Sequence, residues 1–230
     1  MPNTENARRA LIVVDVQNDY DADGNLAIEH PPFADTIRQI ARAMDEATVR
    51  GVKVVVVRMI TPPTAPVFRP GTHGAELHPE IARRPRDHSV EKTLPSAFTG
   101  TDLEFWLRNN DIRTVTVAGY MSQNCDLSTI IHAMHFGFDV EFLSDATGAV
   151  SYANRAGHAS AEEIHRVVKV VLQARFAAVL STDEWIGHLE NGTPPARDNI
   201  YGSHQAAISG ATSSASRAVR PAQPPQTKAG

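Results

Sequence analysis

The chain has 230 residues, of which 42% are hydrophobic and 21% charged, and its formal net charge is -4 at pH 7. This length fits one domain of ordinary size, and the lack of a basic excess argues against a nucleic-acid partner. Polar residues interrupt every apolar run short of the ~18 residues of a membrane span, no secretory signal is evident, and the single cysteine can form no intrachain disulfide. The composition predicts a soluble, cytoplasmic protein without a membrane partner.

Strand and helix patterns alternate along the chain. A strand, ALIVV, begins at Ala10 and leads into Asp15, and its unbroken apolar run is typical of a parallel strand buried on both faces. A helix follows over residues 32–50, with Gly51 as its stop signal. Further strands are expected over residues 52–60, 89–92, 114–120, 139–146 and 177–182, and further helices over 101–110, from about 125, and over 160–176. This alternation predicts an α/β fold, a three-layer α/β/α sandwich around a mostly parallel, Rossmann-like doubly wound sheet.

Two segments interrupt the alternation. The connection Thr61–Asp87 is long and carries several prolines and arginines, and loops of this length are typically lids or binding loops. Residues 188–230 are poor in large apolar side chains, so their burial cannot offset the entropy cost of ordering them. The sequence therefore predicts an N-terminal arm over residues 1–9, one domain over residues 10–187 and a disordered C-terminal tail over residues 188–230.

Three reactive side chains fall at predicted strand ends, where open parallel sheets bind ligands. Asp15 follows the first strand, Lys92 ends a strand, and Cys125 lies at a predicted helix N-terminus. Taken singly, each has a more ordinary interpretation as a loop acceptor, a solvated lysine or a small core residue. Taken together they can carry out a reaction. The helix N-terminus and Lys92 would lower the thiol pKa from about 8.5, and Asp15 would accept the thiol proton and return it to a leaving amine.

Three motifs carry a family resemblance. The segments VVDVQND (13–19), EKTLPSAFTGTDLEFWLR (91–108) and VAGYMSQNC (117–125) resemble the isochorismatase-like cysteine hydrolases, the superfamily that includes nicotinamidases and N-carbamoylsarcosine amidases. The likeness runs in the family order from Ala10 to Trp185. It implies that Asp15 is the general base and acid, Lys92 the thiolate stabiliser and Cys125 the nucleophile. It also implies a homo-oligomer, a dimer or larger.

The resemblance further implies the structure of the turn before Cys125. A non-proline cis peptide would join Tyr120 to Met121 and turn the Met121 amide inward, so that the Met121 and Cys125 amides form an oxyanion hole. Gln17, Phe98 and Tyr120 are further candidates for contact with the substrate.

Two departures from the family pattern refine the prediction. Nicotinamidases carry an Asp-x-His metal motif after the second strand, whereas this chain reads VVRMITPP there, so neither a metal nor another cofactor is expected. The residue after the cysteine is commonly aliphatic in the family. Here it is Asp126, whose charge would raise the thiol pKa if it lay close.

These features predict a metal-independent cysteine hydrolase that cleaves an amide C–N bond of a small molecule through a thioester on Cys125. Superfamily members that hydrolyse the vinyl ether of isochorismate generally lack this cysteine. Two alternatives stay open. One is an isochorismatase-type vinyl ether hydrolase, in which Asp15 protonates the substrate and Cys125 is incidental. The other is a non-catalytic binding or assembly protein on the same fold.

Overall fold

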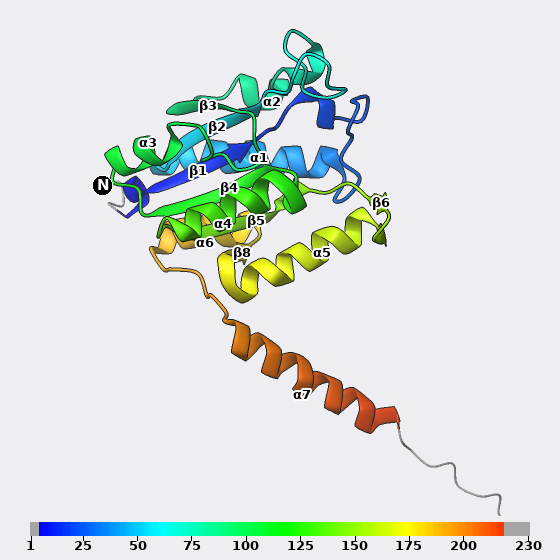
Figure 1. Cartoon of the computed structure of the whole chain (residues 1–230). Helices are drawn as coiled ribbons and strands as arrows, with labels where there is room; N and C mark the ends of the chain where they lie inside the picture. Colours follow the sequence, from blue (N-terminus) through cyan, green and yellow to red (C-terminus); the bar gives the residue numbers. More distant parts are fainter. Residues whose placement is uncertain (1–4, 219–230) are drawn as a thin grey trace, which may run out of the picture.

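A computed structural model describes the backbone of residues 5–218 and the side chains of residues 5–210. Its centre is a six-stranded sheet in the order β3-β2-β1-β4-β5-β8, in which every neighbouring pair is parallel. The chain starts in the middle with β1, moves to one edge, and returns with β4 to the other side of β1 (Figure 1). This is a doubly wound topology, so the predicted fold class is confirmed. The strands are β1 Arg9–Val14, β2 Lys53–Met59, β3 His88–Lys92, β4 Thr114–Tyr120, β5 Asp139–Gly148 and β8 Ala178–Leu180.

Helices cover both faces of the sheet (Figure 1). On one face lie α1 (Phe33–Arg50) and α6 (Thr182–Asn191), and on the other lie α3 (Leu103–Asn109), α4 (Leu127–His135) and α5 (Ala161–Val171). The other α-helices and strands are α2 (Pro79–Ala82), the hairpin of β6 (Tyr152–Asn154) and β7 (Gly157–Ala159), and α7 (Ile200–Ala218), which points away from the domain. Within residues 5–218, no helix combines the length and the apolar character that crossing a membrane requires.

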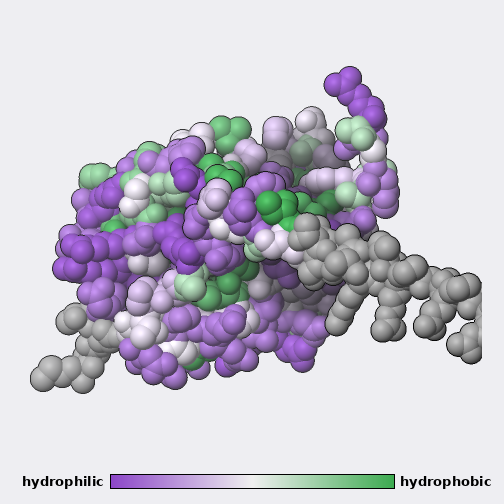
Figure 2. All heavy atoms as spheres, turned by 90° about the horizontal axis from the view of Figure 1, so that it is seen from below, coloured by the Kyte–Doolittle hydropathy of each residue, from purple (hydrophilic) through white to green (hydrophobic). Residues whose placement is uncertain are grey.

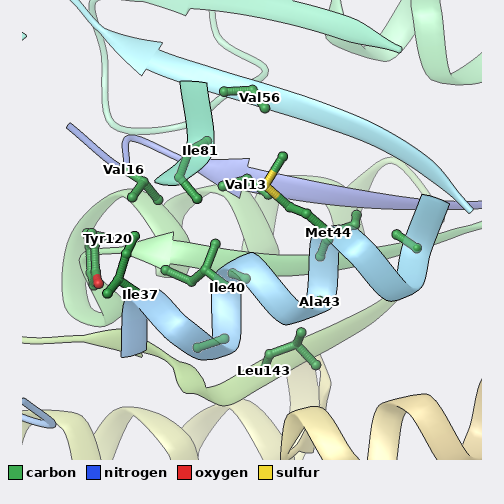
Figure 3. Close-up of a cluster of buried hydrophobic side chains, with 14 of the residues drawn as sticks. Val13, Val16, Ile37, Ile40, Ala43, Met44, Val56, Ile81, Tyr120 and Leu143 are labelled. Atoms are coloured by element: carbon green, nitrogen blue, oxygen red, sulfur yellow. The ribbon is translucent and has the colours of Figure 1, made fainter. Parts of the chain in front are cut away.

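β1 is buried on both faces, as its unbroken apolar run predicts. Val13 belongs to the cluster under α1, and Ile12, which points to the opposite face, belongs to the cluster under α3, α4 and α5. On the α1 side, Ile40 and Met44 pack against Val13 and its neighbours (Figure 3). Each such side chain contributes about 1.5–3 kcal/mol through its removal from water. The two clusters thus fix the sheet between its helix layers and hold the strand ends in place.

The C-terminal region differs from the prediction of disorder from residue 188 onward. α6 extends past this boundary and buries Leu189, and residues 200–218 form α7. Local signals account for both helices. The Ser181 side chain caps α6, and Asn199 Oδ1 accepts a hydrogen bond from the Gly202 amide in the first turn of α7. The prediction is therefore wrong for the two helical stretches. Residues 1–4 and 219–230 lie outside the described residues.

Candidate active site

The three predicted reactive residues meet at the carboxyl edge of the sheet. Asp15 directly follows β1, Lys92 is the last residue of β3, and Cys125 lies in η4 (Ser122–Asp126), a single π-helical turn between β4 and α4. β1 and β4 are the neighbours at which the strand order reverses. Sheets of this topology bind ligands in the crevice at that point, so the fold itself gathers these side chains at a binding position.

The Lys92 ammonium connects the other two groups. Its Nζ lies 2.6 Å from Asp15 Oδ2 and donates to Cys125 Sγ at 3.1 Å and to the Leu94 carbonyl oxygen at 3.2 Å. The ammonium therefore has one ion-pair partner, Asp15, and two hydrogen-bond acceptors. None of the three reactive residues is more than 2% exposed, so the ion pair is shielded from water.

Burial shifts the pKa of each of these groups. It raises the pKa of the Asp15 carboxyl, against the opposing effect of the Lys92 ammonium. Burial also raises the pKa of the Cys125 thiol, and the negative charge of Asp15 raises it further. Together these effects outweigh the lowering of the thiol pKa by Lys92. For Lys92, burial alone would lower the pKa, but the charges of Asp15 and Cys125 raise it overall. The site therefore holds a neutral thiol, a protonated lysine and a carboxyl with increased basicity.

The backbone around Asp15 fixes the position of its carboxyl. Asp15 has φ 51°, in the left-handed region that aspartate tolerates better than most side chains. Its amide donates to the Val57 carbonyl at 3.0 Å, and its carbonyl accepts from the Gln17 amide at 2.8 Å. Bonds on both sides of the residue therefore tie the turn to β2 and to the following segment.

The turn that carries Cys125 begins at a cis peptide between Tyr120 and Met121, at the position that the resemblance implies. The Met121 carbonyl accepts hydrogen bonds from the amides of Asn124, at 3.0 Å, and Asp126, at 3.2 Å. Both residues of the predicted oxyanion hole, Met121 and Cys125, thus lie on one short, hydrogen-bonded turn. Their role in binding an oxyanion stays a prediction.

Comparison with known proteins identifies the family. The family model of the isochorismatase domain matches residues 9–184, which is most of the chain. The chain belongs to the isochorismatase family. An isochorismatase homologue of solved structure from Burkholderia xenovorans LB400 is 60% identical, covers 89% of this chain and 98% of its own, and superposes with a TM-score of 0.87.

Two further solved structures of this family connect the fold to named activities. A cysteine hydrolase from Pseudomonas syringae pv. phaseolicola is 27% identical over 84% of this chain and 97% of its own, with a TM-score of 0.76. An N-carbamoylsarcosine amidase from Thermoplasma acidophilum is 26% identical over 76% of this chain and 97% of its own, with a TM-score of 0.62. The chain is therefore a hydrolase of the isochorismatase family, and the predicted resemblance is confirmed.

Gln17 is not available for the predicted contact with substrate. Its Nε2 donates to the carbonyls of Met59, at 3.0 Å, and Ala75, at 2.8 Å, and its Oε1 accepts from the Met59 amide at 2.9 Å. Both amide protons and the oxygen are therefore used, and the side chain is fully buried. Gln17 instead joins the end of β2 to the long loop, which corrects the prediction.

The two predicted aromatic contacts are both buried in this structure. Tyr120 is fully buried and packs in the cluster under α1, and its hydroxyl lies 2.7 Å from Thr36 Oγ1 (Figure 3). Its contact with substrate stays a prediction. Phe98 is 6% exposed and packs with the rings of His132 and Phe138. Its contact with substrate stays a prediction.

Asp19 is an anchor that the sequence analysis did not single out, although it ends the first motif. Its Oδ2 accepts from the Phe68 amide at 2.6 Å, and its Oδ1 accepts from Asn25 Nδ2 at 3.0 Å. A Cβ on Gly74 would lie 2.3 Å from this carboxylate. Asp19 therefore holds the predicted binding loop, Thr61–Asp87, at Phe68 against the segment that follows β1, and it leaves room only for a glycine at position 74.

Ser122 and His165 form a second support that the sequence did not predict. Ser122 Oγ donates to the Gly148 carbonyl at 2.8 Å and lies 3.0 Å from His165 Nδ1, which must then be the donor to Ser122. Burial, with Lys169 and His30 nearby, lowers the pKa of His165 to about 4. A neutral histidine on α5 thus braces the turn that carries Cys125.

Asp126 is not the main cause of the raised thiol pKa of Cys125. Its Oδ2 accepts from Thr147 Oγ1 at 2.6 Å, and the residue is fully buried. Burial raises the pKa of Asp126 from 3.8 to about 7. The thiol pKa is raised chiefly by burial and by Asp15, rather than by Asp126. Asp126 is therefore a buried carboxyl whose own ionisation affects the stability of the fold.

Replacing Asp126 with asparagine is expected to stabilise the protein more at alkaline than at acidic pH. The unfolded chain ionises this group near pH ~4 and the folded chain at about 7, so between these values the folded state binds more protons and the wild type loses stability as pH rises. The asparagine keeps an acceptor for Thr147 without that loss. In urea unfolding, the gain should be on the order of 2 kcal/mol larger near pH ~8 than near pH ~5. An equal gain at both pH values would contradict the buried titration.

Within residues 5–218, no group of three or more His, Cys, Asp or Glu side chains is placed to hold a metal ion. The residues that the structure brings together at the sheet edge are Asp15, Lys92 and Cys125.

Proposed function

We propose that this chain is a metal-independent cysteine amidohydrolase that cleaves the C–N bond of a small amide through a thioester on Cys125. The observation that carries the proposal is the buried Lys92 ammonium, which lies 2.6 Å from Asp15 and 3.1 Å from Cys125 Sγ. A core lysine would need only one counter-charge. Here the Lys92 ammonium contacts both a carboxylate and a sulfur. Nucleophilic attack by a thiol requires these two groups, a base and a nucleophile. The names of two relatives, a cysteine hydrolase and an N-carbamoylsarcosine amidase, agree with this chemistry.

The reaction begins with transfer of the thiol proton to Asp15. The raised pKa of Asp15 favours this transfer, and Lys92 stabilises the thiolate as it forms. Cys125 Sγ then bonds to the substrate carbonyl carbon, and the carbonyl π electrons move to the oxygen. The amides of Met121 and Cys125 stabilise the resulting oxyanion. When the C–N bond breaks, Asp15 returns its proton to the leaving nitrogen, and an acyl thioester remains on Cys125.

Hydrolysis of the thioester uses the same groups in the reverse direction. Asp15 takes a proton from a water molecule, whose oxygen bonds to the thioester carbon. The C–S bond then breaks, the acid leaves, and the proton on Asp15 restores the thiol. Asp15, Lys92 and Cys125 are at most 2% exposed. The reaction therefore suits a small substrate that reaches these side chains after the surrounding side chains shift.

A panel of small amides and ureas tests the proposal. Ammonia or amine release is measured, and an acid quench during turnover followed by peptide mass spectrometry locates the acyl group. We expect release with at least one compound and an acyl adduct on the peptide of Cys125. Pyruvate release from isochorismate without an adduct would favour the ether hydrolase. A chain with neither activity nor adduct would favour the binding protein.

A further inference from the structure

Ser122 connects the turn that carries Cys125 to two neighbouring elements. It directly follows Met121 in the chain and is fully buried. Its hydroxyl donates to the carbonyl of Gly148, the last residue of β5, at 2.8 Å, and lies 3.0 Å from Nδ1 of His165 on α5. Because the single hydroxyl proton is used on Gly148, the imidazole donates to Ser122. The serine oxygen is therefore held between an acceptor on one element and a donor on another.

The end of β5 is fixed on the acceptor side of Ser122. A Cβ on Gly148 would lie 2.4 Å from Ile28 Cγ2, so the chain has little space there. The amide of the next residue, Ala149, donates to the His30 carbonyl at 2.8 Å, and its carbonyl accepts from the His30 amide at 3.2 Å. The Gly148 carbonyl therefore cannot easily follow a displaced Ser122.

Helix α5 is fixed on the donor side of Ser122. A capping box of Ser160 and Glu163 closes its first turn, and the Ala161 amide donates to Ser151 Oγ at 3.0 Å. His165 lies one turn after Ala161, on the same buried face of the helix. The helix therefore sets where the imidazole lies.

α5 also separates this histidine from solvent. Its outer face lies on the side of the molecule that Figure 2 views, where α7 leaves the domain in Figure 1 and apolar groups appear among hydrophilic ones. Val167 and Val170 are 46% and 62% exposed there, whereas His165 is 2% exposed. Burial, with Lys169 and His30 nearby, keeps the pKa of His165 at about 4, so the ring is a neutral donor at pH 7.

The two ring nitrogens of His165 differ in their contacts. Nε2 is buried, and it forms no hydrogen bond within residues 5–210. A leucine would fill similar space without placing a polar nitrogen in the interior. The bond from Nδ1 to Ser122 is therefore what distinguishes histidine from an apolar residue at this position.

This bond bears on the amides that would bind an oxyanion. The Met121 carbonyl accepts from the amides of Asn124 and Asp126, so the peptide that joins Met121 to Ser122 belongs both to the turn and to the Ser122 anchor. Donors of an oxyanion hole act at about 2.7–3.1 Å from the oxygen, and a misplacement of about 1 Å lowers a rate by roughly 10²-fold. Without the His165 bond, this peptide and the adjoining Met121 amide are less firmly held.

We propose that His165 is a positioning residue for the oxyanion hole: its Nδ1–H holds Ser122 against β5 and so fixes the amides of Met121 and Cys125. It acts on the reaction through this turn. This role rests on the proposed cysteine hydrolase reaction, in which those amides stabilise the oxyanion. It makes α5, in addition to the strand ends, an element that the reaction needs.

Two reactions of Cys125 test the role of His165. Amide turnover passes through an oxyanion, whereas alkylation by iodoacetamide displaces iodide at a saturated carbon and forms none. His165→Leu should lower kcat on the best amide of the panel by roughly 10²-fold, with KM and the alkylation rate each within about threefold of the wild type. Because Cys125 is the only cysteine, mass spectrometry of the intact protein follows its alkylation alone.

The outcomes separate the role of His165 from the proposed function. If the wild type turns over an amide and His165→Leu keeps its kcat, His165 has no positioning role and the proposed function stands. If the alkylation rate falls as far as kcat, the substitution disturbs the thiol itself, and positioning of the amides is refuted. If the wild type releases no amine from any compound, the proposed function fails and the role of His165 fails with it.

Conservative variants identify the nitrogen that acts. His165→Asn places an amide N–H close to the position of Nδ1 and should recover most of the lost kcat, whereas the amide of His165→Gln reaches the position of Nε2 and should not recover it. This comparison does not depend on the folding of His165→Leu. Equal kcat values for the asparagine and glutamine variants would contradict the proposed contact.

A double variant tests whether His165 acts through Ser122. Ser122→Ala should lower kcat as His165→Leu does, and the two changes together should lower it little further, because both break the same connection. Losses that multiply in the double variant would show that His165 acts by another route and would overturn the proposal.

Val168→Ala is the matched control for loosened packing of α5. Val168 lies on the same helix and packs in the same apolar cluster as Cys125. Its truncation should lower the free energy of unfolding in urea and leave kcat within about threefold of the wild type. A loss of kcat equal to that of His165→Leu would mean that any loosening of α5 has this effect, which would overturn the specific role of His165.

Discussion

Replacing Asp15 with asparagine is expected to lower amide turnover by roughly 10³-fold or more. The asparagine keeps the size of the side chain but cannot take the proton of Cys125, whose thiol pKa burial has already raised. Attack by sulfur then lacks a base, and the leaving nitrogen lacks an acid. In the wild type, turnover should fall as pH drops through the pKa of Asp15, which lies above the ordinary value of 3.8. A pH profile of kcat/KM on the best amide of the panel measures both effects.

A loss of activity in Asp15→Asn could also arise from unfolding, because the variant leaves the fully buried Lys92 side chain without its counter-charge. Removing one partner of a buried pair costs about 3–5 kcal/mol, whereas removing both charges is often close to neutral. The double variant Asp15→Asn with Lys92→Met should therefore recover stability in urea unfolding while turnover stays lost. Recovery of turnover together with stability would contradict the assignment of Asp15 as the base.

The sheet and its reactive edge were predictable from the sequence because both follow from local patterns. The unbroken apolar run before Asp15 is typical of a strand covered on both faces, and the helix signals between 32 and 51 supply one cover. Once strand and helix alternate, the carboxyl ends of the strands share one edge. Asp15, Lys92 and Cys125 then fall on that edge without any knowledge of the tertiary structure.

The prediction for Gln17 fails because of a partner that is distant in sequence. Gln17 stands close to Asp15 in the chain, but the Ala75 carbonyl that accepts from its side chain lies 58 residues away. A position close to a reactive residue in the chain does not show whether a side chain contacts substrate or instead forms hydrogen bonds with backbone groups of the fold. The tail was mispredicted for the opposite reason. Its composition was weighed as a whole, while helices α6 and α7 begin at individual capping residues.

Gly119→Ala is expected to be the most destabilising single substitution near the site, with a cost of at least about 3–5 kcal/mol. Gly119 faces Val14 in the pairing of β4 with β1 and has φ 118°. A Cβ at this position would lie 2.1 Å from the Val14 carbonyl oxygen and 2.6 Å from its nitrogen. Because the obstacle is backbone, β1 and β4 must separate where the strand order reverses, between Asp15 and the turn that carries Cys125.

Gly137→Ala is the matched control for this substitution. Gly137 also has a positive φ, 83°, but a Cβ there would meet nothing within 4 Å, so alanine costs only the backbone strain of about 1–2 kcal/mol. Urea unfolding should show the larger loss for Gly119→Ala. Any Gly119→Ala protein that folds should also lose turnover, because the strand shift moves Asp15 relative to Cys125. Equal costs for the two glycines would mean that β1 and β4 do not approach this closely. The loops, rather than the sheet, would then set the distance between the Asp15 carboxyl and the Cys125 thiol.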